Sequence, residues 1–209
     1  MLALVGCAPA DANAPGIHLS SELTGDDVTL TWDGHRSGVV VEFATEPDGP
    51  YTILDFPPAD RTTFEHPDLM PATTFYYRVR PVTGPTSTPS APTVPVSSDV
   101  PPANEDWIVP RTKPDPGADL KPGGTPTNLL AQTVAPDGLL LTWRDNATDE
   151  AGYLVEAEVD GGFQVVFVVD PDINSAGIIT LESERADTYR VRAYRFGEQS
   201  NVVHEQTAG

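Results

Sequence analysis

The sequence has one cysteine, few basic residues and no long hydrophobic run, and each shortage excludes a class of protein. The single cysteine, Cys7, cannot form an internal disulfide or supply the ligand set of a structural zinc site. No apolar stretch approaches the ~20 residues that a membrane-spanning helix needs. Lysine and arginine total 12 against 31 acidic residues, which gives a net charge of −19. So negative a chain repels phosphate backbones, and we expect no nucleic-acid partner.

Residues that interrupt helices are abundant, with 22 prolines and 17 glycines among 209 residues. This density excludes a helical bundle or a coiled coil. The patterned stretches instead alternate with a period of two. Val28, Leu30 and Trp32 alternate with threonines, and Tyr153 and Val155 begin a similar alternation in the second half. Short alternating runs separated by turn residues predict an all-β sandwich architecture.

The two halves of the chain repeat one another. Trp143 follows Trp32 by 111 residues, and the run Tyr77-Arg-Val-Arg80 recurs 112 residues later as Tyr189-Arg-Val-Arg192. Agreement in both order and spacing indicates duplication. We therefore predict two related, seven-stranded, immunoglobulin-like sandwiches in tandem.

The repeats and the composition between them predict the domain boundaries. The first sandwich spans residues 15–97 and the second spans residues 125–207. Residues 98–124 are acidic and proline-rich, which is typical of a semi-extended linker. Residues 1–14 are interpreted as a truncated lipoprotein signal followed by a tether.

Both halves resemble fibronectin type III domains. The family pattern has an early proline, a tryptophan that ends the second strand, and a Tyr-Arg-Val-Arg strand after a Leu-x-Pro-x-Thr corner. The residues that match the pattern in the first half are Pro15, Trp32, Val41, Leu69, Pro71, Thr73, Tyr77 and Val79. Those in the second half are Pro126, Leu129, Trp143, Tyr153, Val155, Leu181, Tyr189 and Val191.

This resemblance implies roles for the matched residues. The expected structural core is Trp32, Val41, Leu69, Tyr77, Val79, Trp143, Tyr153, Val155, Leu181, Tyr189 and Val191. The corner tyrosine of such sandwiches, whose hydroxyl bonds back to the chain, falls at Phe75 and Asp187, neither of which can form that bond in the usual way. Domains of this family usually serve as spacers or binding platforms, and the fold itself carries no chemistry.

Cys7 is the sharpest functional signal. The run Leu4-Val-Gly-Cys7 is similar to the lipobox of bacterial lipoproteins, in which cleavage before the cysteine allows it to carry diacylglycerol. Only six residues precede Cys7, fewer than a complete signal peptide has. The resemblance implies a lipid anchor and a place outside the cytoplasm, on the cell envelope. The alternative is a chance cysteine in an N-terminal tail.

Four of the 12 basic residues lie on the same strand of each repeat, and these are Arg78, Arg80, Arg190 and Arg192. The alternation directs them outward, with Glu42, Glu156 and Glu158 on the neighbouring strands. One interpretation is cross-strand ion pairs at a wet surface, each contributing less than ~1 kcal/mol. The other is a platform for carboxylates or acidic sugars.

Two further features have alternative interpretations. Trp107 begins an apolar island, Trp-Ile-Val, in the acidic linker; it either docks against a sandwich or is a recognition motif for a partner. The oxygen-rich run 145–150 either turns between two strands through bonds to its own backbone or binds calcium. Its spacing is not that of a helix-loop-helix calcium site, so we expect no metal.

Catalytic and cofactor-binding motifs are lacking, so we predict neither an enzyme nor a cofactor. The four histidines are scattered, and no His-Glu-x-x-His or Gly-x-Ser-x-Gly run is present. The leading hypothesis is a cell-envelope lipoprotein that acts as a spacer or contacts an unknown protein or polysaccharide, with the membrane reached only through its lipid. The alternative is a glycan-binding accessory module of a polysaccharide-degrading system. Its candidate stacking residues are Tyr51, Tyr76, Phe163 and Tyr194.

Overall fold

The protein is all-β in the computed structural model, which describes residues 16–33, 38–93, 107–180 and 185–209. Within those ranges, no helix is long and apolar enough to cross a bilayer. The strands before the middle of the chain are β1 (Leu19–Thr24), β2 (Asp27–Trp32), β3 (Val39–Ala44), β4 (Thr52–Asp55), β5 (Thr63–His66) and β6 (Thr74–Thr83). Those after it are β7 (Thr127–Ala135), β8 (Gly138–Arg144), β9 (Gly152–Val159), β10 (Gly162–Val169), β11 (Ser175–Ile179), β12 (Tyr189–Phe196) and β13 (Val203–Gln206).

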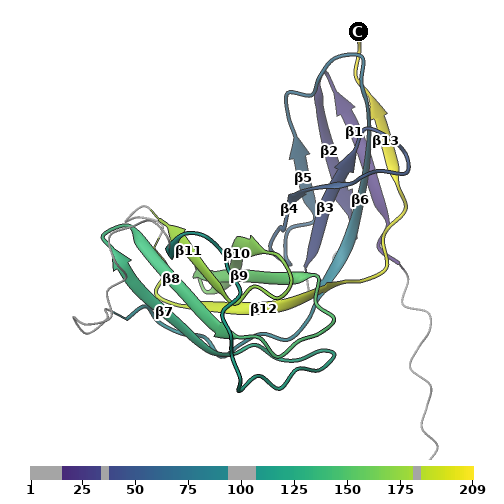
Figure 1. Ribbon diagram of the computed structural model, residues 1–209. Coiled ribbons are helices and arrows are strands. Elements are labelled where there is room, and N and C mark those ends of the chain that lie inside the picture. The colour runs from purple at the N-terminus through teal and green to yellow at the C-terminus, as the bar shows by residue number, and fades with distance from the viewer. Residues whose placement is uncertain (1–15, 34–37, 94–106, 181–184) are drawn as a thin grey trace, which may run out of the picture.

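These strands form three sheets that build two lobes joined at a bend (Figure 1). A sheet with the order β1-β2-β5 covers one face of the first lobe, and one with the order β11-β8-β7 covers one face of the second. The third sheet has seven strands and runs through both lobes in the order β10-β9-β12-β6-β3-β4, with β13 also paired to β6. The two lobes are therefore continuous through one sheet.

Each lobe encloses its own apolar core because the strands alternate in burial. Along β2, Val28, Leu30 and Trp32 are buried while the threonines between them are exposed. The first core includes Tyr77 and Val79, and the second forms around Trp143 and Tyr153. This spacing puts one apolar face of each strand between two sheets, as a sandwich requires.

A third apolar cluster lies where the lobes join. Val40, Val82, Leu154 and Tyr194 are each at most 4% exposed and pack together. They come from β3 and β6 on one side and from β9 and β12 on the other. The sheet continues across this point through the pairing of β12 with β6. The junction is therefore packed like the interior of a domain.

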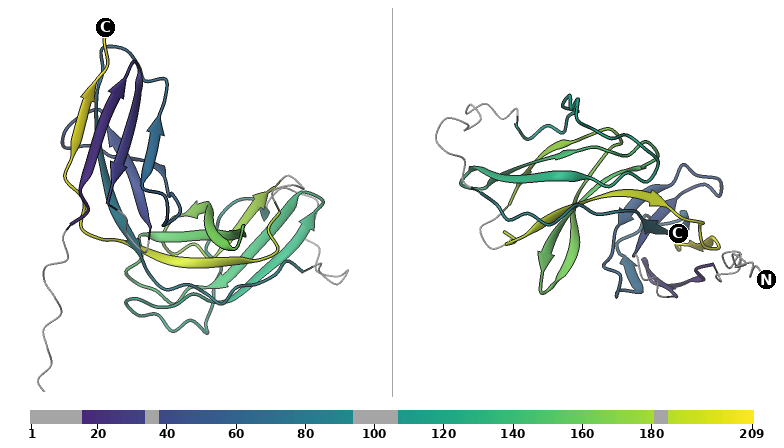
Figure 2. Two further views of the ribbon diagram at one scale, coloured as in Figure 1. Left: turned by 180° about the vertical axis from the view of Figure 1, so that it is seen from behind. Right: turned by 90° about the horizontal axis from the view of Figure 1, so that it is seen from below.

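The last strand of the first lobe comes from the far end of the chain. After β12 the chain leaves the second lobe, and β13 pairs antiparallel with β6, with Val203 opposite Tyr77 (Figure 1). The backbone N–H of Ser200 donates to the carbonyl of Val79 at 2.9 Å, and the N–H of Val79 donates to the Ser200 hydroxyl at 3.0 Å. In the left view of Figure 2 the C-terminal segment lies beside the first strands of the chain.

The reciprocal crossing brings residues 84–93 from the first half onto the second lobe. There the N–H of Ser87 donates to the carbonyl of Val191 at 2.8 Å, and the N–H of Val191 donates to the Ser87 hydroxyl at 3.0 Å. Gly84 stands at the crossing with φ at +138°, and a Cβ built there would lie 1.9 Å from the carbonyl oxygen of Ala193. Only glycine fits so close a backbone approach. The two halves have thus exchanged their final segments: the first lobe receives β13, and the second lobe receives residues 84–93, which pair there through isolated bridges.

This exchange alters the predicted architecture. The all-β class holds, but two separate seven-stranded sandwiches are not confirmed, because the central sheet and the exchanged segments belong to both lobes. The predicted boundaries 15–97, 98–124 and 125–207 stay a prediction. What the structure adds is that β13, near the end of the second repeat, pairs in the first lobe.

Candidate functional site

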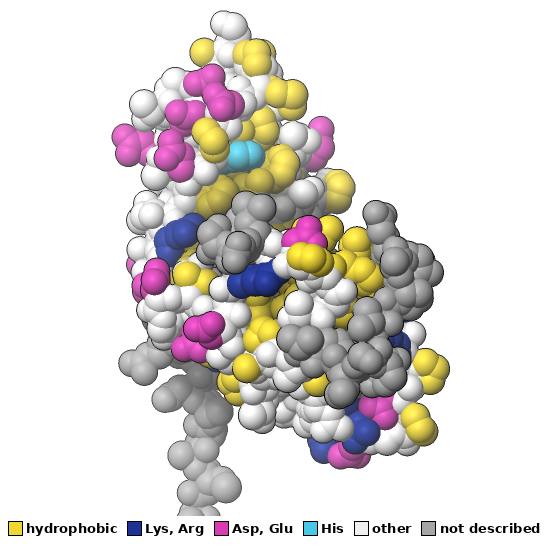
Figure 3. Space-filling view, turned by 90° about the vertical axis from the view of Figure 1, so that its left-hand side faces the viewer, with side chains coloured by type: hydrophobic (Ala, Val, Ile, Leu, Met, Phe, Trp, Pro, Cys, Tyr) yellow, Lys and Arg dark blue, Asp and Glu magenta, His cyan; other side chains and the backbone are white. Residues whose placement is uncertain are grey.

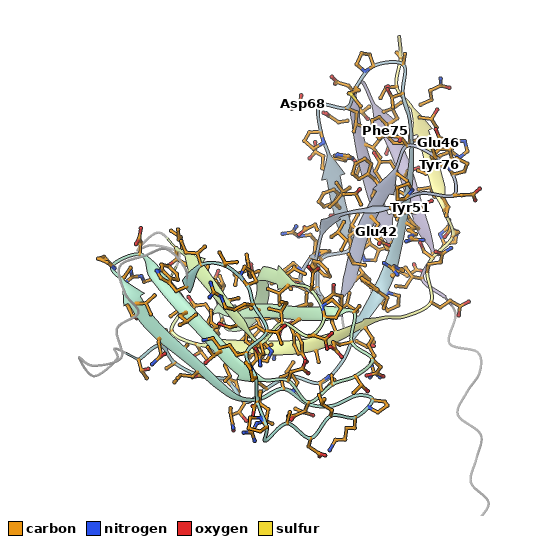
Figure 4. All side chains as sticks on the ribbon, viewed as in Figure 1. Glu42, Glu46, Tyr51, Asp68, Phe75 and Tyr76 are labelled. Atoms are coloured by element: carbon orange, nitrogen blue, oxygen red, sulfur yellow. The ribbon has the colours of Figure 1, made fainter. Side chains whose placement is uncertain are left out.

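Two matching clusters of one glutamate and two arginines lie on the central sheet. In the first cluster, β3 places Glu42 directly opposite Arg78 of β6. The Glu42 carboxylate accepts from Nε of Arg78 at 2.8 Å and from Nη2 of Arg80 at 2.6 Å. Figure 4 shows Glu42 and Tyr51 on neighbouring parts of the first lobe. The guanidinium of Arg78 lies 3.9 Å from the centre of the Tyr51 ring, a cation–π contact.

The second cluster repeats this geometry on β9 and β12. Glu156 lies opposite Arg190, and its carboxylate accepts from Nε of Arg190 and, at 2.9 Å, from Nε of Arg192. Arg190 covers the ring of Phe163 at 3.9 Å. Glu158, which the sequence placed with this group, is exposed. The repeat therefore preserves a three-residue unit of charge +1.

The clusters differ from the wet-surface ion pairs that the alternation suggested. The side chains of Glu42 and Glu156 are 2% and 6% exposed, whereas those of the four arginines are 17–23% exposed. Both glutamates point away from the apolar cores, and the arginine side chains lie over the glutamates. A carboxylate removed from water in this way depends on its partners, because an unpaired buried charge is strongly destabilising.

Both clusters hold the crossing segments. Arg78 donates to Oε1 of Gln199 at 2.8 Å, and Arg80 lies 3.5 Å from the centre of the Phe196 ring. Arg192 donates from Nη1 to the carbonyl of Gly84 at 3.3 Å. Each contact joins an arginine of one half to chain that crosses from the other half. The arrangement supports a structural role for the clusters at the strand exchange.

Replacing Glu42 by glutamine should therefore be costly. Glu42→Gln preserves the shape but leaves two guanidiniums without their counter-charge, and we expect a loss of about 3 kcal/mol in the free energy of unfolding. Glu65→Gln is the matched control, because Glu65 is an exposed residue of β5; it should change stability by less than ~0.5 kcal/mol. Urea denaturation measures both. Equal effects of the two changes would contradict the assigned role of Glu42.

A cleft of about 190 Å³ lies between the lobes beside the second cluster. Arg190, Arg192 and Phe163 line it from the second lobe, and Phe56 and Pro57 line it from the first. Figure 3 looks onto this inner side of the bend and shows hydrophobic and basic side chains gathered there. Glu156 also lines this cleft, and its carboxylate already pairs with both of these arginines.

The aromatic residues considered for glycan stacking do not form an exposed row. Tyr51 and Phe163 lie under arginines, and Tyr76 stacks on His204 with ring centres 5.7 Å apart. Tyr194 is 4% exposed and belongs to the junction cluster. Stacking on a sugar needs an open ring face. These four residues therefore give no platform of the kind that the glycan hypothesis needs.

Trp107 lies against the second lobe. A Cβ built at Gly138 or Gly177 would lie 2.5 Å from atoms of the Trp107 ring, so these two glycines leave the space that the indole fills. Arg111 then donates its backbone N–H to the carbonyl of Ser175, and Lys121 donates to that of Asn146. The described part of the predicted linker thus follows the second lobe, and its contacts favour docking over a free recognition motif.

The oxygen-rich run 145–150 is held by bonds to the protein itself. The Asp145 carboxylate accepts from the backbone N–H of Ala147 and from the Tyr153 hydroxyl. Burial raises the pKa of Tyr153, so this hydroxyl stays protonated and donates. Asp145, Glu150 and Asp172 offer oxygens within 4.8 Å of one another. Hydrogen bonds engage one oxygen of Asp145 and one of Glu150, whereas Oε2 of Glu150 is buried and has no hydrogen-bond partner among the described residues. The absence of a metal here stays a prediction.

The residues predicted as core lie inside the lobes where they are described. At most 6% of each residue's surface is exposed for Trp32, Val41, Leu69, Tyr77, Val79, Trp143, Tyr153, Val155, Tyr189 and Val191. Leu181 and Cys7 lie outside the described residues. One hydrogen bond of the corner was not predicted from the sequence. The hydroxyl of Tyr189 accepts from the N–H of Ala186 at 3.2 Å, so a tyrosine two residues beyond the expected corner position bonds back to the chain.

Comparisons with known proteins give similar structures only. No protein-family profile matches the chain, and no curated protein matches it. One similar solved structure contains the FN1–FN3 domains of chicken CNTN1, at 13% identity and a TM-score of 0.28, with 88% of this chain and 60% of that one covered. This chain therefore spans less than two thirds of that structure. Another is a two-domain fibronectin type III segment from chicken tenascin, at 16% identity and a TM-score of 0.27, with 90% and 95% covered.

Proposed function

We propose that this protein is a non-catalytic module of the bacterial cell envelope, built from two fibronectin type III-like halves and anchored by a lipid on Cys7. It serves as a spacer or as a surface for interaction with a protein or polysaccharide. The observation that carries the proposal is the pair of crossing segments, which joins the lobes through one continuous sheet and a buried junction. A stiff, bent unit of this kind suits a part that must hold a fixed shape away from a membrane.

The contacts of the described titratable residues support a non-catalytic role. His66 Nδ1 lies 3.1 Å from the Tyr77 hydroxyl, and His204 stacks on Tyr76. Burial raises the pKa of Tyr77, so its hydroxyl keeps its proton beside the histidine. The arginines are occupied by Glu42 and Glu156. These groups serve packing and ion pairing in the described parts of the chain.

Lipidation of Cys7 is tested by expression behind a complete bacterial lipoprotein signal peptide. The wild type should partition into membranes and into detergent, because two or three acyl chains give effectively permanent attachment. Cys7→Ser should remain in the aqueous fraction. Intact-mass measurement should find the acyl chains on a mature chain that begins at Cys7. An unmodified Cys7 in the purified protein would end the lipoprotein proposal.

The second candidate function, an accessory module that binds glycans, now rests on the cleft. Arg190 and Arg192 line it beside Phe163 and Glu156. An acidic sugar would bind there through the guanidinium N–H groups that Glu156 does not use, since each guanidinium carries five such donors. A glycan array separates the two functions. Binding of uronic-acid glycans that is lost in Arg190→Gln would favour the accessory module, whereas no binding would leave the spacer.

A further inference from the structure

The C-terminal segment is complementary to the first lobe, although it is covalently continuous with the second. Asn201 accepts from the N–H of Leu19 and donates to its carbonyl, both at 2.9 Å. The Ser21 hydroxyl donates to Glu205 at 2.6 Å. Thr207 donates its hydroxyl to the carbonyl of Met70 at 2.6 Å. Side chains as well as backbone thus direct this segment to the first lobe.

The opposite segment, residues 85–93, fits the second lobe in the same manner. Ser90 exchanges two backbone hydrogen bonds with Tyr189, at 2.8 and 2.9 Å. Thr93 exchanges two more with Ala131 and Thr133, both at 2.9 Å. The interface between residues 16–93 and residues 107–207 therefore includes β13 on β6 and residues 85–93 on the second lobe, the latter paired through isolated bridges, with the junction cluster between them.

The two complementary pieces are joined in the chain by residues 94–106. The hydrogen bonds between the pieces would be the same if each piece belonged to a different copy. We propose that two copies of this chain exchange halves, so that residues 16–93 of one copy pair with residues 107–207 of the other. The partner at this interface is a second copy of the chain, and the pairing of β13 with β6 is the contact that an experiment can detect most readily.

The protein concentration during folding decides whether the closed monomer or the exchanged dimer forms. Within one chain the linkage sets an effective concentration on the millimolar scale, which favours the closed monomer in dilute solution. The exchanged dimer keeps the same strand pairings and forms when chains fold together at high concentration, as in other domain-swapped proteins. The proposal concerns this interface alone and does not depend on a lipid anchor.

Two single-cysteine variants of the full chain test it in a Cys7→Ser background. One carries Tyr76→Cys and the other carries His204→Cys; these residues face each other across β6 and β13. The two variants are mixed, unfolded, refolded together at high concentration and then oxidised. The mixture should give a disulfide-linked dimer that contains one chain of each variant. Glu158→Cys replaces His204→Cys in the control mixture, because Glu158 is an exposed residue on the second lobe.

Light scattering on the wild type, refolded in the same way, provides a measurement that needs no substitution. The proposal expects a species of twice the monomer mass, together with a linked pair that exceeds the control mixture. Each single variant is first checked by circular dichroism and thermal melting against the wild type. A monomer as the sole species at every concentration, with no more linked pair than in the control, would overturn the exchange between copies.

Discussion

Removing residues 198–209 is expected to destabilise the first lobe, although this segment follows the last strand of the second. The truncation deletes β13 and leaves the edge of β6 unpaired. Ser200 and Asn201 alone make four hydrogen bonds to Val79 and Leu19. At about 1 kcal/mol for each bond, their loss costs about 4 kcal/mol. Amide hydrogen exchange in β3 and β6 should therefore accelerate by roughly 10³-fold.

A matched pair of substitutions distinguishes a specific effect from a general loss of chain. Val203 packs on the first core, whereas its neighbour Val202 is 40% exposed. Val203→Asp should reproduce the accelerated exchange in β3 and β6, and Val202→Asp should not. If the truncation instead released the amides of β9 and β12 and left β3 and β6 protected, the strand exchange would be wrong.

Trp143→Ala should act on the second lobe. Trp143 is 4% exposed, and its ring centre lies 5.4 Å from that of Tyr153 in the second core. Removing a buried tryptophan side chain costs about 3–5 kcal/mol, close to the whole stability of a small domain. Exchange should accelerate in β8 and β9, while β2 and β3 stay protected because β13 remains on the first lobe.

The control for this change is Trp143→Phe. Among the described residues, the buried indole N–H of Trp143 has no hydrogen-bond partner. Phenylalanine removes this donor and keeps an aromatic ring in the core. Its cost should be less than half that of alanine. Hydrogen exchange resolved by mass spectrometry measures both variants. Equal loss of protection in the two lobes of Trp143→Ala would show that they unfold as one unit.

The alternation of residues predicted the all-β class and the side chains inside each lobe. Val28, Leu30 and Trp32 lie in one core because a strand places every second residue on the same face. The repeat also predicted that Trp143 and Tyr189 occupy equivalent places in the second core. These features follow from local pattern alone, which is why the sequence was sufficient for them.

The strand exchange could not be predicted in this way. Ser87 follows Val79 by eight residues and Ser200 follows Val191 by nine, so each serine could bond to the valine of its own half. In the structure each bonds to the valine of the other half. The local pattern is the same in both arrangements. The one signal in the sequence was Gly84, whose meaning depends on the nearby backbone of the other half.

The burial of Glu42 and Glu156 was missed for a related reason. Alternation directs both side chains away from the apolar core, and in the structure both do point away from it. Their burial comes from the arginines that lie over them. The sequence did contain two arginines for each glutamate on adjacent strands. The contacts of these arginines with Phe196 and Gly84 could not be predicted from the sequence, because they depend on the crossing of the two segments.

The most direct test of the strand exchange compares two disulfides in monomeric protein that carries Cys7→Ser. His204→Cys is combined either with Tyr76→Cys, its partner across β6 and β13, or with Thr188→Cys, the residue that occupies the position of Tyr76 in the second repeat. Disulfides form only between residues that are already close and correctly oriented. The structure predicts that the pair at positions 76 and 204 oxidises within one chain and that the pair at 188 and 204 does not. Oxidation of the 188 and 204 pair alone would show that each half keeps its own last strand.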